Sequence, residues 1–372
     1  MAGILAGVLL LRETSAAQFV LIGEEHGVAE VPKLVAAVVR HGAAQGYRFF
    51  GIEVGAQMAR ELNQMALSPD ITKRVDQFTR DRPPGIPFVT LREEAELLGA
   101  AVAAMGNRPD VLWGLDYDIV ADRWLLPRLR ESSATPAARR ALDDAIALSD
   151  TLLARALRER NPGLAMMFGG SDSVFTALRA ALAPADGSEA DEALALMEET
   201  LAINQLFVSR RGLESNERRG RLMKRQLARA LAGSRMEGSL PRAVFKFGAS
   251  HMMRGRTLTN IFDMGNTLAE LAALEGRSSF HVFVLGGPGS QHAQMDPTVF
   301  QYKPAPGDLD RIPALATVAA ESPADQWTLF DVRQLRARAR SLTSDPAVLQ
   351  ILFGFDVVVI LGGSTPSTSL GS

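Results

Sequence analysis

Short apolar runs alternate along the chain with amphipathic stretches, and this alternation predicts a mostly parallel sheet covered by helices. Each apolar run is rich in β-branched or aromatic residues and has the length of one buried strand. The predicted strands are residues 18–23, 48–54, 111–115, 243–247, 280–285 and 355–360. The predicted helices between the early strands are residues 31–45, 55–66 and 93–105. The predicted fold class is therefore α/β, with a mostly parallel central sheet flanked by helices.

The strand pattern stops between residues 121 and 240, where long segments with helical periodicity take over at 137–160 and 189–232. A helical block inserted between the strands of one sheet usually lies over the strand ends, so we expect this insertion to act as a lid. The predicted organisation is a first part of the α/β core at 1–120, the insertion at 121–240, the second part of the core at 241–363 and a tail at 364–372. The tail is of low complexity and is predicted to be disordered.

Charge and cysteine content exclude several classes of protein. The 372 residues carry 40 Lys and Arg against 42 Asp and Glu, a balance that argues against a nucleic-acid platform and a polybasic membrane binder. The absence of Cys excludes disulfides, thiolate nucleophiles, Cys-ligated zinc and iron–sulfur clusters. We therefore expect a small-molecule substrate, whereas partner proteins stay unknown.

No apolar run is long enough to cross a bilayer, so no transmembrane segment is expected. Residues 3–11 are similar to the apolar part of a signal peptide, but they lack a preceding basic region and Arg12 ends the run early. A first helix explains them equally well. A cytoplasmic and an exported (periplasmic) location are both compatible with this pattern.

Common catalytic motifs are missing from the sequence. There is no GxSxG nucleophile elbow, and no Walker A or GxGxxG pattern follows a predicted strand. The strongly basic stretch 210–229 is interpreted as a solvated helix face neutralised by Glu214 and Glu217. These exclusions leave the segment around His26 as the best candidate for chemistry.

Acidic and imidazole side chains follow four of the predicted strands. Glu24 and His26 come after the first strand, Glu53 ends the second, Asp116 follows the third and His251 follows the strand at 243–247. The carboxyl ends of parallel strands meet at one edge of a sheet, where ligands bind in open α/β folds. We therefore expect these five side chains to cluster, with Glu24 and His26 pointing to the same side.

Each residue also has a structural interpretation. A His after a strand is often only a turn-stabilising residue, and Glu53 or Asp116 could instead pair with Arg60 or Arg123. The convergence of several polar groups on one edge favours a functional site. His41 and His281 lie within a predicted helix and a predicted strand and are interpreted as structural or surface residues, whereas His292 is a weaker site candidate.

The strand-end motifs resemble those of the erythromycin esterase-like family. The matching segments are GEEHG at 23–27, GIE at 51–53, GLDY at 114–117 and KFGASH at 246–251. The resemblance continues through Asn216, Arg219 and Met223, then Met264-Gly265 and Phe355-Asp356, so it covers most of the chain in the family's order. The family's water-activating His matches His26, and its other central residues match Glu24, His251 and Glu53.

One departure from the family pattern concerns the first motif. Macrolide esterases have two residues between the Glu and the His, whereas one residue separates Glu24 from His26. This shorter spacing is similar to the haem-binding lipoprotein ChaN and to the TIKI/TraB-like group, which includes metal-dependent peptidases. Lys33 also stands where the esterases tend to have an arginine. The resemblance therefore implies the superfamily rather than a macrolide substrate.

The predicted function is that of a hydrolase in which His26, assisted by Glu24, activates water for attack on an ester or related carbonyl. His251 or Arg254 would stabilise the oxyanion. The residues expected to bind substrate are Asp116, Arg254, Arg219 and His292.

Three further interpretations stay open at this point. In the first, Glu24, His26 and His251 hold a divalent metal that lowers the pKa of a bound water. In the second, the protein is a ChaN-like binder of haem or iron, with a His as axial ligand and no catalysis. A degenerate homologue with a scaffolding role is a third alternative.

Overall fold

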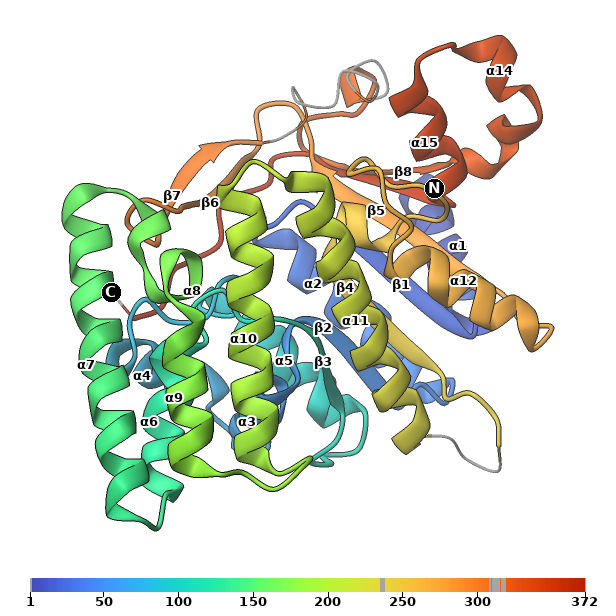
Figure 1. Ribbon diagram of the computed structural model, residues 1–372. Helices are drawn as coiled ribbons and strands as arrows, with labels where there is room; N and C mark the ends of the chain where they lie inside the picture. The colour runs from blue at the N-terminus through green and yellow to red at the C-terminus, as the bar shows by residue number, and fades with distance from the viewer. Residues whose placement is uncertain (1, 235–237, 308, 310–314, 316–318, 372) are drawn as a thin grey trace.

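The computed structural model describes residues 2–234, 238–307, 309, 315 and 319–371, and its centre is a seven-stranded sheet (Figure 1). The strand order is β3-β2-β4-β1-β5-β9-β8, and all neighbouring strands are parallel except β8 and β9. The strands are β1 (Phe19–Glu24), β2 (Phe49–Gly55), β3 (Leu112–Asp116), β4 (Ala243–Gly248), β5 (Ser279–Gly286), β8 (Trp327–Asp331) and β9 (Val357–Leu361). The predicted α/β class with a mostly parallel sheet is confirmed.

Two further strands, β6 (Gln291–Asp296) and β7 (Gln301–Pro306), form a separate antiparallel hairpin. The α-helices are α1 (Ala2–Ala16), α2 (Glu30–Ala44), α3 (Ala56–Ala66), α4 (Ile71–Asp81), α5 (Arg92–Ala104), α6 (Asp122–Ser132), α7 (Pro136–Glu159), α8 (Met166–Gly169), α9 (Asp172–Leu182), α10 (Glu189–Val208), α11 (Gly212–Ser234), α12 (Met264–Leu274), α14 (Ala339–Leu342) and α15 (Pro346–Gly354). Short 3₁₀ helices include η2 (Ala249–Met252) and η4 (Val332–Arg338).

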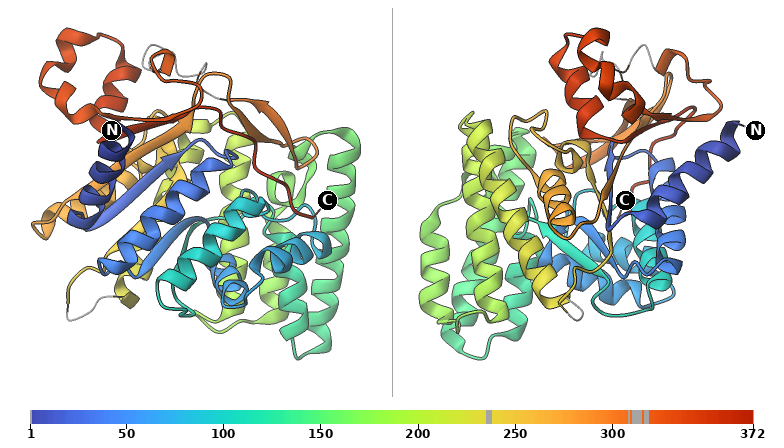
Figure 2. Two further views of the ribbon diagram at one scale, coloured as in Figure 1. Left: turned by 180° about the vertical axis from the view of Figure 1, so that it is seen from behind. Right: turned by 90° about the vertical axis from the view of Figure 1, so that its right-hand side faces the viewer.

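Helices cover both faces of the sheet, with α2 and α5 on one side and α11 and α12 on the other (Figure 2). Successive residues of a strand point to opposite faces, so each strand contributes to both layers. In β1, Val20 and Ile22 belong to the core under α2, whereas Phe19 and Leu21 belong to the core under α11 and α12. A strand buried on both faces reads as a continuous apolar run, which is why these strands were predictable.

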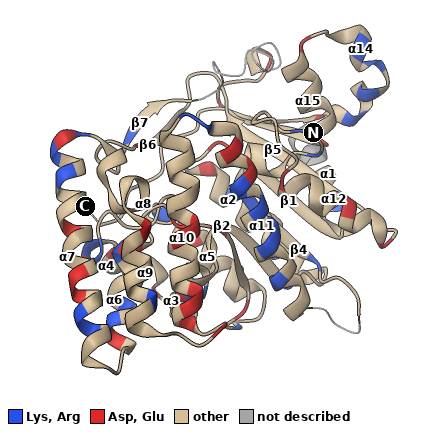
Figure 3. Ribbon diagram, viewed as in Figure 1, with Lys and Arg blue, Asp and Glu red and all other residues tan. Residues whose placement is uncertain are grey.

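The described part of residues 121–240 contains the helices α6 to α11 and no strand of the sheet. Figure 3 marks the positions of the basic and acidic residues along the ribbon, α10 and α11 included. Glu199 pairs with Arg218 at 2.8 Å and with Arg225 at 3.2 Å, and Arg211 pairs with Glu214. Part of the basic stretch is therefore neutralised, by Glu214 as expected and also by Glu199 of the neighbouring helix.

The C-terminal tail corrects one prediction. Residues 364–371 are ordered, whereas 364–372 were predicted to be disordered; residue 372 lies outside the described residues. The backbone amides of Thr365 and Thr368 donate to Glu30 and Glu93, each at 2.9 Å. Leu370 is buried. Polar composition alone suggested disorder because it does not reveal these partners on α2 and α5.

The N-terminal apolar run forms part of helix α1. The Tyr47 hydroxyl donates to the carbonyl oxygens of Thr14 and Ala17, at 2.8 and 2.6 Å, and ties the end of α1 to the core. None of the helices in the described part of the chain combines the length and the apolar character that a bilayer span requires.

Candidate active site

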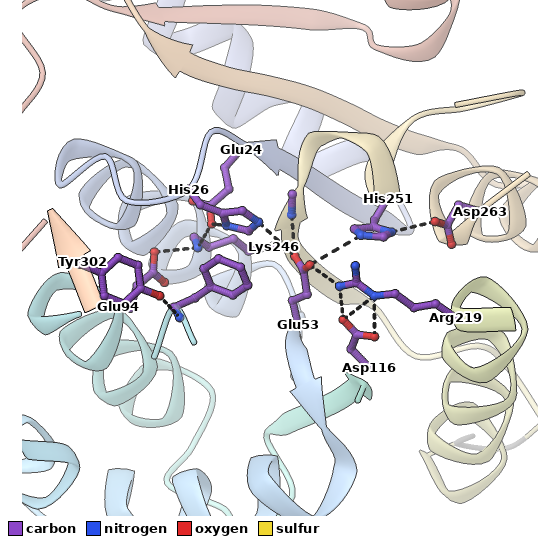
Figure 4. Close-up of polar contacts among 12 residues, drawn as sticks. Glu24, His26, Glu53, Glu94, Asp116, Arg219, Lys246, His251, Asp263 and Tyr302 are labelled. Carbon is purple, nitrogen blue, oxygen red and sulfur yellow. Dashed lines mark hydrogen bonds and ion pairs between the residues drawn. The ribbon is translucent and has the colours of Figure 1, made fainter. Parts of the chain in front are cut away.

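A cluster of ionisable side chains lies at the carboxyl ends of β1, β2, β3 and β4 (Figure 4). Glu24 ends β1, Glu53 lies near the end of β2, Asp116 ends β3, and His251 lies in η2 directly after β4. Glu53 bridges the two histidines, with one carboxylate oxygen 3.5 Å from His26 Nε2 and the other 3.6 Å from His251 Nε2. The five residues expected at one sheet edge therefore lie together.

His26 is held by contacts on several sides. Its Nδ1 is hydrogen-bonded to Glu24 Oε1 at 2.9 Å, and its ring stacks on Phe88 with centroids 3.8 Å apart. Gly248 leaves room for the ring, because a Cβ there would lie 2.8 Å from His26 Nε2. Burial lowers the pKa of His26, but the carboxylates of Glu53 and Glu24 outweigh that effect and raise it.

Behind His26, a buried lysine joins two glutamates. Lys246 Nζ donates to Glu24 Oε1 at 2.5 Å and to Glu94 Oε1 at 2.8 Å, and all three side chains are buried. Burial alone would raise the pKa of Glu24, yet Lys246 and His26 bring it below its usual value. Burial raises the pKa of Glu94 to about 7 despite the nearby ammonium. Glu24 is therefore an anion that can stabilise a positive charge on His26.

Arg219 of α11 neutralises the other side of the cluster. Its guanidinium donates to Asp116 through Nε and Nη2 and to Glu53 Oε1 at 2.7 Å. Although burial would raise the pKa of Glu53, the charges of His26, His251 and Arg219 lower it to about 2. Glu53 is thus ionised at neutral and mildly acidic pH, and its charge acts on both histidines.

His251 forms a second histidine–carboxylate pair. Its Nδ1 is 2.7 Å from Asp263 Oδ2, and the other oxygen of Asp263 accepts from the amide of Met264 at 2.8 Å. Asp263 is therefore also the N-cap of α12, so the same residue begins the helix and orients the imidazole. Burial and Arg219 lower the pKa of His251, but Asp263 and Glu53 outweigh them and raise it.

Glu53→Gln is expected to lower the pKa of His26. The charge of Glu53 is the largest of the effects that raise this pKa, and the amide keeps the shape of the side chain without the charge. Titration of the His26 ring by NMR measures the change, and the His41 ring, in the body of α2, serves as internal control. An unchanged His26 titration would show that Glu53 does not act on this ring.

Two small cavities open beside the cluster. One, of about 30 Å³, is lined by residues that include Glu24, His26 and Lys246, and the other, of about 20 Å³, by residues that include Asp116 and Arg219. Among the described residues of 121–240, Arg219 alone lines either cavity. The role of the helical insertion as a lid therefore stays a prediction.

Two residues expected to bind substrate lie elsewhere. Arg254 donates to both carboxylate oxygens of Asp356, at 2.7 and 2.5 Å, and to the carbonyl of Ser279 at the beginning of β5. These contacts hold Arg254 at the amino edge of the sheet, away from Glu24 and His26. This position does not fit its expected roles in substrate binding and oxyanion stabilisation. His292 lies in β6 with its Nδ1 3.1 Å from Glu25, and it lines neither cavity.

The predicted metal ligands do not form a metal site. Glu24 directs Oε1 at His26 Nδ1 and at the ammonium of Lys246, a cation that would repel a metal ion. Glu53 lies between His26 and His251. Within the described ranges, no three His, Asp or Glu side chains are arranged to hold an ion. Glu24, His26 and His251 therefore do not form the metal site that the sequence led us to expect.

The arrangement also does not fit haem. One face of the His26 ring is covered by Phe88, and the adjoining cavity of about 30 Å³ is far smaller than a porphyrin. The ring of His251 is fixed between Asp263 and Glu53. In the observed conformation, the space beside His26 is therefore too small for haem.

His281 is buried in β5 as a neutral ring. Its Nδ1 is 2.7 Å from the Met252 carbonyl and its Nε2 is 2.8 Å from the Ser279 hydroxyl, a pattern that needs one donor and one acceptor. Burial and the nearby Arg254 lower its pKa to about 3. The ring is therefore structural, as its position in a strand suggested.

His281 is expected to make folding sensitive to mild acid. In the unfolded chain the pKa of His281 is near 6.5, so the ring is protonated below that pH. In the folded state the ring stays neutral until the pH falls to about 3. The stabilisation is thus complete above pH 6.5, and the free energy of unfolding falls by up to about 1.4 kcal/mol per pH unit below it. Urea denaturation from pH 7 to 4 measures this slope in the wild type and in His281→Gln. Equal slopes would contradict the assignment.

Four residues of the site were not selected from the sequence: Phe88, Glu94, Lys246 and Asp263. Lys246 could have been recognised in the sequence, because it lies inside the apolar run AVFKF. A lysine in a buried strand needs a partner of opposite charge. Asp263 begins a helix and could have been recognised as an N-cap. Phe88 and Glu94 reach the site only through tertiary packing, and no local pattern marks them.

The fold is that of the erythromycin esterases. A crystal structure of a histidine-to-asparagine variant of erythromycin esterase EreC, in its open conformation, aligns over 98% of this chain and 95% of its own, with a TM-score of 0.58 and 14% identity. A Bacillus cereus protein aligns over 96% of this chain and 92% of its own, with a TM-score of 0.57 and 14% identity. No protein-family model and no curated protein matches the sequence. The chain therefore has an erythromycin esterase-like fold.

Proposed function

We propose that the protein is a hydrolase in which His26 activates water for attack on an ester or a related carbonyl. The observation that supports this most strongly is the 2.9 Å hydrogen bond between His26 Nδ1 and Glu24 Oε1. It fixes the ring so that Nε2 is the nitrogen that can take a proton. The proposal is also consistent with the fold, since one protein that shares it is an erythromycin esterase.

In the proposed reaction, a water oxygen bonds to the carbonyl carbon while its proton passes to His26 Nε2. Glu24 stabilises the imidazolium that forms, as the carboxylate of a catalytic triad does. The same proton then passes to the oxygen of the leaving group as the bond from that oxygen to the carbonyl carbon breaks. No covalent enzyme intermediate is needed, in keeping with the absence of a nucleophile elbow.

Positive charge for the oxyanion comes from the other half of the cluster. Arg219 and His251 both contact Glu53, and the raised pKa of His251 favours its protonated form. Donors that are already oriented can stabilise a developing negative charge at little reorganisation cost. Asp116 keeps Arg219 in position.

A screen of aryl esters, lactones and small peptides tests the proposed function. The wild type is expected to turn over at least one ester, and Glu24→Gln is expected to reduce kcat by roughly 10²- to 10⁴-fold, because it removes the anion that stabilises the imidazolium. Glu25→Gln is the matched control, since this neighbouring carboxylate faces the Gly286 amide instead. No turnover by the wild type, or equal loss in both variants, would contradict the proposal.

A further inference from the structure

Phe88 covers one face of His26, the residue that activates water in the proposed function. It lies between α4 and α5, and its ring is nearly parallel to the His26 imidazole, with centroids 3.8 Å apart and an interplanar angle of 17°. A molecule approaching that face of the imidazole must first displace the phenyl ring.

Three residues, Glu53, Val54 and Phe88, line both cavities of the site. Glu53 is held by ion pairs and Val54 lies in β2, so Phe88 is the part of this shared wall that lies outside the sheet. On one side lies the cavity of about 30 Å³ with His26 and Lys246, and on the other the cavity of about 20 Å³ with Asp116 and Arg219. Cavities of this size admit water but no larger organic molecule. A substrate that reaches both His26 and Arg219 therefore needs the phenyl ring to move.

The backbone of Phe88 is held in an unusual conformation. Its φ of +66° lies in the left-handed region, which bulky residues rarely adopt. The Tyr302 hydroxyl of β7 accepts a hydrogen bond from the Phe88 amide at 2.5 Å and supports this conformation. Ile86 and Val89 are buried on either side. The backbone of the segment is thus anchored, so any opening of the site here requires the phenyl side chain itself to move.

We propose that Phe88 is the gate that controls access to the covered face of His26 and thereby determines the size of the esters that the enzyme accepts. The control of access to His26 is inferred from the stacking and the cavities. The selection of esters by size also rests on the proposed hydrolase function. With the gate in the observed position, the site holds water or a very short acyl group. Longer acyl groups enter only when the ring swings away.

Chemical modification tests the gate without any assay of turnover. Diethyl pyrocarbonate acylates accessible, unprotonated imidazoles, and mass spectrometry gives the rate at each histidine. We expect His26 to react several-fold faster in Phe88→Ala than in the wild type, with smaller gains in Phe88→Leu and Tyr302→Phe. The rate at His41 should not change. A pH series separates a change of access from a change of protonation.

Phe262→Ala is the matched control, because Phe262 is 60% exposed and lines neither cavity. A His26 rate that does not change in Phe88→Ala and Phe88→Leu, with both variants folded by circular dichroism, overturns the gate. A faster modification rate at His26 in Phe88→Ala supports the gate even if neither the wild type nor any variant hydrolyses an ester. In that case the hydrolase proposal is overturned and the gate is not.

The ester part is tested with p-nitrophenyl esters of increasing acyl length. In Phe88→Ala, kcat/KM for the long esters is expected to rise relative to the acetate, whereas Phe262→Ala keeps the wild-type order. The same chain-length preference in Phe88→Ala and wild type would contradict a role of Phe88 in specificity.

Discussion

His26→Ala is expected to abolish measurable ester hydrolysis while leaving the protein folded. Loss of a positioned general base lowers the rate by roughly 10²- to 10⁴-fold. The cost in stability should be small, about 1–2 kcal/mol, because 28% of the His26 side chain is exposed and Lys246 still neutralises Glu24. Steady-state kinetics and thermal melts of wild type and variant measure the two effects.

His41→Ala is the control for this substitution. His41 lies in the last turn of α2, where its Nε2 is 2.8 Å from the Ser15 hydroxyl, and it lines neither cavity. Its loss should leave kcat unchanged. If His26→Ala retains the activity of His41→Ala, or if it unfolds far below the wild type, His26 is a structural residue and the proposed mechanism is wrong.

Arg219→Met is expected to cause the largest loss of stability among the site variants. Arg219 is the guanidinium that contacts both Asp116 and Glu53, and the carboxylates of both are buried. Removing one partner of a buried ion pair leaves uncompensated charge and costs about 3–5 kcal/mol. Urea denaturation at neutral pH measures the difference from the wild type.

Arg218→Met offers a neighbouring control on the same helix. Arg218 pairs with Glu199 at 2.8 Å, but 37% of its side chain is exposed, and exposed ion pairs contribute about 0–1 kcal/mol. If Arg219→Met is no more destabilising than Arg218→Met, the two carboxylates do not depend on Arg219 for their charge balance.

Six of the seven strands of the sheet could be predicted because a parallel sheet is buried on both faces. The antiparallel edge strand β8 was not predicted. Runs such as FVLIG in β1 and VVVIL in β9 have no polar face, and composition alone marks them as strands. The sequences of β6 and β7, QHAQMD and QYKPAP, are polar and partly exposed, and their pairing with each other is visible only in the structure. The tail was wrongly predicted for the same reason, since its partners lie far away in sequence.

The position of the site could be predicted from one rule, that parallel strands end at a common edge. That rule placed Glu24, Glu53 and Asp116 together before any contact was known. It could not show that Lys246 shares Glu24 with His26, since that depends on the register of β1 against β4. The rule says nothing about Arg254, which was expected to bind substrate but pairs with Asp356 just before β9.

The central claim, that His26 is the base, can be tested most directly by comparing two pKa values in the wild type. One is the pKa of the His26 ring from NMR titration, assigned among the five histidines by the signal missing in His26→Ala. The other is the pKa that governs the rise of kcat/KM with pH for the best ester substrate. We predict that the two agree and lie above the usual 6.5, because Glu53 and Glu24 raise the pKa of His26. A rate that falls as the His26 ring loses its proton, or that follows a different group, would contradict the mechanism.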